Sequence, residues 1–320
     1  MRIALFFAAA VLVSGLSAEG LAQKYPIKTM RMISAFAPGG GTDILARAIA
    51  TPVSESFGQA VVVDNRPGAG GATGSELVAR ATPDGYTIIM VASTYTATSA
   101  YHKPSFDPVN GIQPIVLIGT TGLVMTVHPS VPVKSVRELI GYAKANPGKL
   151  NYASVGPGSV PHLAHEHFKL ETGTNLVHIP YKGGGPALIA VVAGEAQLTA
   201  ISMVPILPHL KAGRLRALAI SNPTRSNLLP DVPTISETVP GFEVIHWYGI
   251  WGPKGMPAAI VARWNKEVAK ILHTDEMKKR TRAEGLEIAG GPPEELGEII
   301  RRDVEKWRRV IREAKISSEG

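Results

Sequence analysis

Residues 30–47 place a short apolar strand, three consecutive glycines and an amphipathic helix in direct succession, and this order constrains the fold more than any other stretch. The glycines at 39–41 remove every Cβ between strand and helix, so backbone N–H groups can converge on one point. Thr42 or Asp43 can cap the first helical turn, which leaves the other free N–H groups and the positive end of the helix dipole facing outward. That arrangement suits an anion, most naturally a carboxylate. An ordinary glycine-rich connection explains the same residues equally well.

The order of strand, glycine turn and helix returns twice in the second half of the chain. A turn at 155–159 precedes a helix expected at 162–172, and a turn at 181–186 precedes an apolar helix expected at 187–193. If each half of the protein contributes one such unit, two helix dipoles point into a shared cleft. Lys182 in the later turn is either an anion contact or an exposed loop lysine.

A further candidate lies where the buried strand expected at 86–92 runs into a hydroxyl-rich tip at 93–96. Ligands of open α/β sheets bind at the carboxyl ends of the strands, which makes Ser93 and Thr94 candidate contacts. The aromatic side chains of the strand expected at 247–251 either line the same cleft or pack in the core.

The chain is long enough for two domains, because it has 320 residues. The apolar runs 115–118 and 123–127, interrupted by residues 119–122, suit a strand that crosses from one domain to the other. The run 215–221 is the expected return crossover.

Composition narrows the possible functions. Hydrophobic residues make up 45% and charged residues 18%, as in a folded globular protein. The net charge is +7, but the basic residues of the C-terminal helices alternate with acidic ones as on a solvated face, and aromatic residues do not interleave with them. We therefore expect no nucleic-acid partner. The absence of cysteine excludes disulfides, thiol nucleophiles and cysteine-ligated metals.

The N-terminus reads as a secretory signal peptide. Arg2 supplies a positive region, residues 3–13 form an apolar run, and residues 20–22 form a small-x-small cleavage site near Ala22. No later stretch reaches the length of a membrane span. We expect an exported, periplasmic protein that begins near Gln23.

Motifs for chemistry are missing. His162, His165 and His167 do not share one helix face, so we expect surface or cleft-edge histidines and no metal site. We find neither a G-x-S-x-G nucleophile elbow nor paired carboxylates. The glycine turns lack dinucleotide and P-loop spacing, so we expect no cofactor. What recurs, backbone donors and hydroxyls, favours binding over catalysis.

Six segments that together span most of the sequence after the signal peptide resemble one family. They are residues 25–47 (YPIKTMRMISAFAPGGGTDILAR), 61–87, 131–159, 178–198 (HIPYKGGGPALIAVVAGEAQL), 207–237 and 251–268 (WGPKGMPAAIVARWNKEV). They resemble the extracytoplasmic solute receptors of tripartite tricarboxylate transporters, also called Bug or TctC-like proteins. The resemblance implies a type II periplasmic-binding-protein fold, an α/β architecture of two domains joined by two crossover strands with the ligand cleft between them.

That fold implies a signal peptide at 1–22, a discontinuous first domain at 23–122 plus 222–320, and a second domain at 123–221. It also implies that backbone N–H groups hold the carboxylates of a small ligand. Residues and resemblance together make the following candidate ligand contacts: Phe36, Pro38, Gly39, Gly40, Gly41, Thr42, Asp43, Ser93, Thr94, Gly156, Pro157, Gly158, Ser159, His162, Tyr181, Lys182, Gly183 and Ser202.

The implied function is capture of a small di- or tricarboxylate, an amino-acid-like or an aromatic carboxylate by a monomer, which delivers it to the membrane subunits of the transporter. Two departures concern the substrate. Ser202 stands close to where family members usually carry an aspartate, and Tyr95 replaces a smaller or more polar residue, which could favour an aromatic carboxylate. Output through a sensor kinase is equally compatible with the sequence.

An enzyme is the remaining alternative. A periplasmic hydrolase would use a cleft serine, one of Ser93, Ser159 and Ser202, with His162 as its base.

Overall fold

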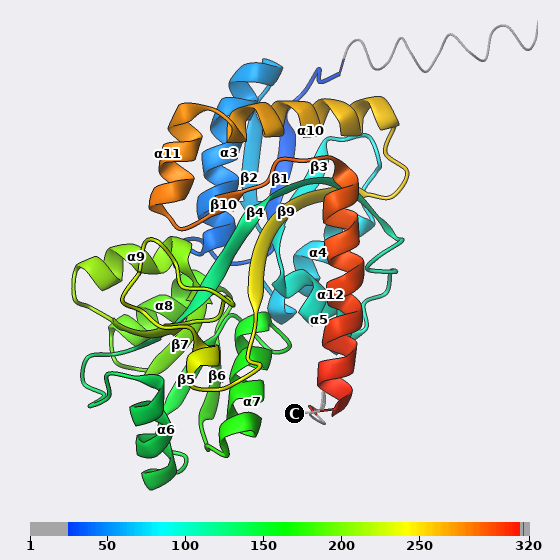
Figure 1. Ribbon diagram of the computed structural model, residues 1–320. Coiled ribbons are helices and arrows are strands. Elements are labelled where there is room, and N and C mark those ends of the chain that lie inside the picture. The colour runs from blue at the N-terminus through cyan, green and yellow to red at the C-terminus, as the bar shows by residue number, and fades with distance from the viewer. Residues whose placement is uncertain (1–24, 314–315, 317–320) are drawn as a thin grey trace, which may run out of the picture.

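The computed structural model describes residues 25–313 and residue 316, so the expected signal peptide lies outside the described residues. In the described chain, ten strands form one mixed sheet in the order β2-β1-β3-β9-β4-β7-β5-β6, with β8 and β10 both paired to β4. Figure 1 shows two masses of helices packed around the two ends of this sheet. We call the mass around β1 and β3 lobe 1, and the mass around β5 and β7 lobe 2.

Lobe 1 has parallel strands at its far edge and antiparallel strands near its centre. Its strands are β1 (Met30–Ser34), β2 (Val61–Asn65), β3 (Thr87–Ala92), β9 (Ile245–Pro253) and β10 (Glu287–Ile288). Its helices are α3 (Gly41–Phe57), η1 (Ala69–Gly71), α4 (Ala72–Ala79), α5 (Thr94–His102), α10 (Ala258–Leu272), α11 (Asp275–Ala283) and α12 (Pro293–Glu313).

Lobe 2 repeats this plan on a smaller scale. Its strands are β5 (Asn151–Ser154), β6 (Val177–Pro180), β7 (Leu198–Ser202) and β8 (Arg216–Ile220). Its helices are α6 (Val136–Ala145), α7 (Val160–Thr172), α8 (Gly184–Val192), α9 (Met203–Lys211) and η2 (Ile235–Glu237).

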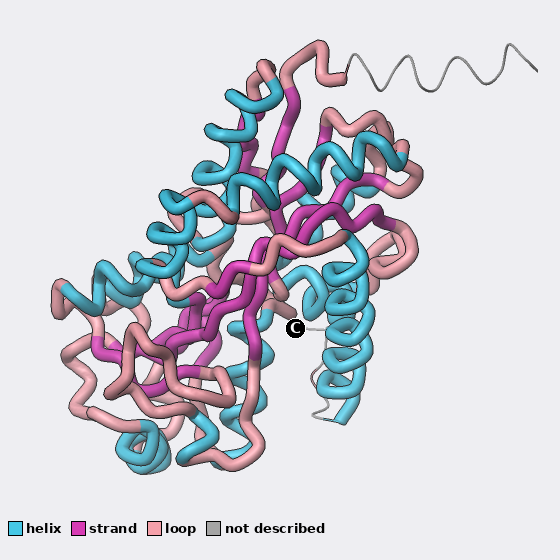
Figure 2. Tube along the Cα trace, turned by 45° about the horizontal axis from the view of Figure 1, so that its top comes forward, coloured by secondary structure: helices cyan, strands magenta, loops and turns pink. Residues whose placement is uncertain are grey.

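The strand β4 (Ile112–Val127) belongs to both lobes. The sequence predicts two runs with a break, but β4 is one strand of 16 residues, with irregular register near Pro114 and Leu117. Its Gly119 permits the close approach of β10, since a Cβ there would collide with the carbonyl of Glu287. Figure 2 shows β4 and β9 running side by side between the lobes. The expected return crossover was wrong: β8 pairs with β4 inside lobe 2, and β9 is the strand that returns to lobe 1.

Local sequence signals explain most of the elements. Ser135 caps α6 by accepting a hydrogen bond from the backbone N–H of Glu138, as serine at an N-cap commonly does. Helix α3 begins at Gly41 and ends at Gly58 in the left-handed conformation that glycine favours. Strands β1 and β3 are buried almost throughout, as their continuous apolar sequences predict.

Helix α5 was missed. Residues 93–96 were expected to be a hydroxyl-rich tip at the end of a strand, yet Ser93 is the N-cap of a helix with six buried residues. This helix packs between α4 and α12, so tertiary packing overrides a sequence without helical periodicity. None of the described helices is both long and apolar enough to span a bilayer.

Candidate functional site

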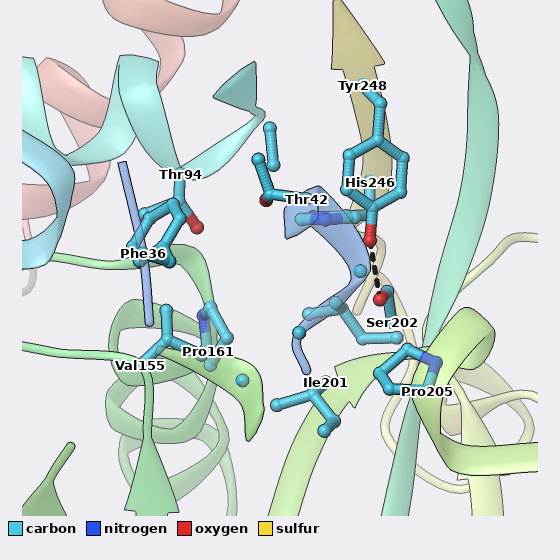
Figure 3. A pocket seen from close by; sticks show the side chains of 15 residues that line it. Phe36, Thr42, Thr94, Val155, Pro161, Ile201, Ser202, Pro205, His246 and Tyr248 are labelled. Atoms are coloured by element: carbon cyan, nitrogen blue, oxygen red, sulfur yellow. Dashed lines mark hydrogen bonds between the residues drawn. The ribbon is translucent and has the colours of Figure 1, made fainter. Parts of the chain in front are cut away.

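A cavity of about 40 Å³ lies between the two lobes. Figure 3 shows Phe36, Thr94, Val155 and Pro161 on one side of it, and His246, Tyr248 and Ser202 on the other. Its full lining is Phe36, Gly40, Gly41, Thr42, Ala92, Thr94, Leu123, Val155, Pro161, Gly184, Ile201, Ser202, Pro205, His246 and Tyr248. Both lobes contribute residues to this small cavity, and their loops touch beside it.

Five helices begin at this cavity: α3, α5, α7, α8 and α9 each place a residue of the first turn or the N-cap in its lining. Four of them, all except α7, lack a side-chain hydrogen bond at the N-cap. The first N–H groups of an α-helix have no partner within the helix, and its N-terminus carries a partial positive charge. The cavity is therefore suited to negative charge, although we expected only two helix starts.

Glycines let the two lobes meet. A Cβ on Gly40 would approach the backbone nitrogens of Gly184 and Gly185 to 3.3 Å, and one on Gly185 would collide with the carbonyl of Pro38. The backbone N–H of Ala37 donates to the carbonyl of Lys182 at 2.9 Å, which ties the loops together. The Lys182 side chain is exposed and does not line the cavity.

The start of α3 differs in detail from the predicted cap. Its N-cap is Gly40, and neither Thr42 nor Asp43 caps it. The Asp43 carboxylate instead accepts hydrogen bonds from Gly39 N–H, from Arg47 and from Asn65, at 2.9–3.0 Å. Partial burial acts to raise the pKa of Asp43, but these hydrogen bonds outweigh it and hold the pKa below its usual value. Asp43 therefore braces the loop and does not face the cavity.

The loop at 156–159 does not resemble the first glycine loop in its hydrogen bonding. Gly156 N–H donates to Ser154 Oγ, Gly158 N–H donates to His162 Nδ1, and His162 N–H donates to Ser159 Oγ, at 3.1–3.3 Å. The Ser159 N–H donates to the Gly156 carbonyl. The donors expected to hold a carboxylate are thus used inside the loop, and only its neighbours Val155 and Pro161 line the cavity.

Two of the three histidines of α7, His162 and His165, are buried rather than superficial, whereas His167 is partly exposed. His162 stacks on His178 with ring centroids 4.1 Å apart, and His165 and His178 stack on Tyr152. Burial lowers the pKa of His162, His165 and His178 to about 4, so all three are neutral at pH 7. No group of side chains among the described residues could hold a metal ion.

Two hydrogen-bonded pairs from β9 border the cavity. Tyr248 donates its hydroxyl to Ser202 Oγ at 2.6 Å, and His246 Nδ1 lies 2.6 Å from Ser93 Oγ. Burial lowers the pKa of His246 to about 3 and raises that of Tyr248, so both side chains are uncharged at neutral pH. A Cβ on Gly41 would collide with the Tyr248 hydroxyl, which places this pair directly beside the start of α3.

These contacts bear on the hydrolase alternative. Among the described contacts, the His162 ring accepts from Gly158 N–H at Nδ1, and Ser159 Oγ accepts from the backbone N–H of His162 rather than from its ring. Of the three candidate serines, Ser93 is paired with a histidine ring, that of His246, and a base with a pKa of about 3 is poorly matched to work at neutral pH.

The predicted contacts divide into two groups. Those that line the cavity are Phe36, Gly40, Gly41, Thr42, Thr94 and Ser202. Those outside its lining are Pro38, Gly39, Asp43, Ser93, Gly156, Pro157, Gly158, Ser159, His162, Tyr181, Lys182 and Gly183.

Sequence reasoning missed nine lining residues, which are Ala92, Leu123, Val155, Pro161, Gly184, Ile201, Pro205, His246 and Tyr248. The aromatic strand at 247–251 was a usable signal for Tyr248, whereas Trp247 and Trp251 pack in the core. Tyr95 does not line the cavity; its hydroxyl donates to the Pro108 carbonyl and its ring packs against Trp251, so it offers no support for an aromatic ligand.

Known proteins are similar to this chain in sequence and in fold. Residues 45–316 match the family model described as "Tripartite tricarboxylate transporter family receptor". The Bordetella pertussis protein BugT is 34% identical over 95% of this chain and 94% of its own. The fold is similar to that of R. palustris Rpa4515 solved with adipate (35% identity, TM-score 0.88, 92% and 99% of the two chains).

It is also similar to that of MatC from Rhodopseudomonas palustris with bound malate (29% identity, TM-score 0.86, 90% and 100% of the two chains). A further similar structure is that of the periplasmic binding protein BugD (32% identity, TM-score 0.88, 92% and 99% of the two chains). On the extent of the family match and of the BugT alignment, the chain belongs to the tripartite tricarboxylate transporter receptor family of solute-binding proteins.

Proposed function

We propose that this protein is a periplasmic receptor that closes its two lobes around a small carboxylate. The observation that carries the proposal is the convergence of five helix starts on one cavity between the lobes, four of them without a side-chain cap. Backbone N–H groups of Gly41 and Thr42 are the proposed carboxylate donors, since both residues line the cavity at the start of α3. The adipate and malate of the solved relatives support this ligand class.

The energetics of such a site are sufficient. Micromolar affinity corresponds to about 8 kcal/mol of binding free energy. A hydrogen bond to a charged group contributes about 1.5–3 kcal/mol, and association costs at least about 4 kcal/mol of rigid-body freedom. Four or five such bonds to one or two carboxylates therefore meet the requirement.

In the proposed closure, the loops around Gly40 and Gly184 come together, and they are in contact in this structure. The proposed domains are 23–122 with 222–320 and 123–221, except that η2 (Ile235–Glu237) packs in lobe 2, and β4 and β9 bend between them as the lobes separate. Opening breaks the hydrogen bond from Ala37 to Lys182 and parts Gly40 from Gly184. The Gly156 and Gly158 turn contributes to closure by its contacts with Gly70 and Tyr101.

The partners and the location follow from this role. A signal peptide at 1–22 exports the protein as a monomer, and the closed form delivers its ligand to membrane subunits of the tripartite tricarboxylate type. A sensor kinase ectodomain that reads the same closed form is the alternative output. No catalysis is part of the proposal.

The test is a thermal-shift screen of mono-, di- and tricarboxylates, in which stabilisation grows with the ratio of ligand concentration to Kd. A matched amide of the best ligand is the control, because amidation removes the charge but keeps the shape. We expect a shift with the carboxylate and none with the amide. Equal shifts would overturn anion capture.

A hydrolase is the second candidate, favoured only by the pair of Ser93 and His246. Release of nitrophenol from short nitrophenyl esters, lost on Ser93→Ala, would support it. Carboxylate binding without ester turnover would reject it.

A further inference from the structure

Serines at the N-caps of the described helices fall into two kinds, those that cap their helix and those, such as Ser93 and Ser202, that do not. Ser135 and Ser159 use their hydroxyls to cap α6 and α7, as serine at an N-cap normally does. Ser202 is the N-cap of α9 but makes no capping hydrogen bond. Its oxygen instead accepts the proton of Tyr248, so the hydroxyl is diverted from its helix toward the cavity.

As a result, the Ser202 hydroxyl can donate a hydrogen bond to a ligand. Because Tyr248 donates to Ser202 Oγ, the proton of the Ser202 hydroxyl is available for another acceptor. Both oxygens lie beside the start of α3, since a Cβ on Gly41 would come within 2.8 Å of Ser202 Oγ. A ligand whose carboxylate binds the α3 start therefore presents its adjacent carbon to Ser202.

No acidic side chain among the described lining residues would balance the charge of a bound cation. Among the described residues that line the cavity, none is Asp, Glu, Lys or Arg, and His246 is neutral. Asp43 lies close in sequence, but its oxygens are occupied by Gly39, Arg47 and Asn65. The helix starts add positive potential. An ammonium group here would be buried without a counter-charge, which costs several kcal/mol.

We propose that Ser202, oriented by Tyr248, selects carboxylates that carry a hydroxyl or keto oxygen on the carbon next to the carboxylate and rejects the corresponding amino acids. An oxygen accepts the Ser202 proton, whereas an ammonium nitrogen has no lone pair to do so. Ser202 is the specificity residue and Tyr248 is its positioning residue. The inference rests on the proposed carboxylate-binding function.

The experiment compares ligands of one shape by calorimetric titration at neutral pH. The four-carbon set is malate, succinate and aspartate, and the three-carbon set is lactate, pyruvate, propionate and alanine. We expect the hydroxy and keto acids to bind about tenfold more tightly than the unsubstituted acid. The amino acid should bind at least about 100-fold more weakly than the hydroxy acid.

Ser202→Ala should lower the hydroxy-acid affinity about tenfold and leave that of the unsubstituted acid unchanged. Tyr248→Phe should reduce the ratio of hydroxy-acid affinity to unsubstituted-acid affinity. A loss of folding would instead lower both affinities alike. Ser75→Ala is the matched control, because Ser75 is also a buried serine on a helix but bonds the Gly71 carbonyl away from the cavity. It should leave the ratio intact.

The outcomes separate the two proposals. Equal affinities of the protein for aspartate and malate would overturn the selectivity alone. So would a Ser202→Ala variant in which the ratio of hydroxy-acid affinity to unsubstituted-acid affinity is unchanged. Binding of no carboxylate at all would overturn the receptor function and the selectivity with it.

Discussion

The two glycine loops at 38–41 and 156–159 connect a strand to a helix in opposite lobes, yet they treat their backbone donors differently. In the first, Asp43 accepts the N–H of Gly39, but α3 begins at an uncapped Gly40 and its first turn lines the cavity. In the second, Ser154 and His162 accept the N–H groups of Gly156 and Gly158, and Ser159 accepts the N–H of His162 in the first turn of α7. Polar side chains within four residues of a glycine loop decide whether its donors remain available to a ligand.

Gly40→Val has the largest expected effect on binding. The backbone of Gly40 is extended, so the open form accepts a side chain, but valine would press on Gly184 and Gly185 and fill part of the cavity. Overpacking of this kind should weaken carboxylate binding about 100-fold, measured by titration, with the melting temperature of the free protein nearly unchanged.

Gly141→Val is the matched control, because a Cβ there meets open space on the outer face of α6. It should keep wild-type affinity. A Gly40 variant that binds normally would contradict the closure of this loop onto α8.

Acid should destabilise lobe 2 through the histidines behind the second loop. The pKa of His162, His165 and His178 falls from 6.5 to about 4 on folding, because burial disfavours their charged forms. Unfolding therefore takes up protons between these values. The stability due to the neutral rings is complete above pH 6.5 and is lost as the pH falls toward 4.

Urea unfolding at a series of pH values measures this loss. The midpoint should fall steeply from pH 6.5 to pH 4. A flat midpoint over that range would mean that these rings are not buried.

His162→Ala separates the two loops most directly. It leaves the buried Gly158 N–H without its acceptor, which should cost about 1–3 kcal/mol of unfolding free energy. Carboxylate affinity should change little, because His162 does not line the cavity. Loss of binding with normal stability would restore the second loop as an anion site. His167→Ala, on the more exposed side of α7, serves as the control.

Lys182→Ala has the smallest expected effect. The ammonium group is exposed, and it is the main-chain carbonyl of Lys182 that contacts the first loop. Affinity should change by about twofold or less. A tenfold loss in the same titration would identify the lysine as a ligand contact.

Local patterns in the sequence were enough to predict most of the elements. The strand expected at 86–92 is β3 (Thr87–Ala92) and the helix expected at 162–172 is α7 (Val160–Thr172), because apolar periodicity, glycine and proline act within a few residues. The helix of Thr94–His102 was missed because its neighbours, not its own sequence, stabilise it. The break expected within β4 is absent because Gly119 lies inside the strand, where it allows contact with Glu287 of β10, a strand distant in sequence.

The sequence by itself determined the type of site: glycine loops at helix starts, hydroxyls and no catalytic set, and the family that carries them. Only the tertiary structure decided which donors face the cavity. His246 and Tyr248 reach it from a strand more than two hundred residues after the first loop, and Ser202 turns to Tyr248 instead of capping its own helix. Such pairings arise from the meeting of two lobes, and no local signal in the chain encodes that geometry.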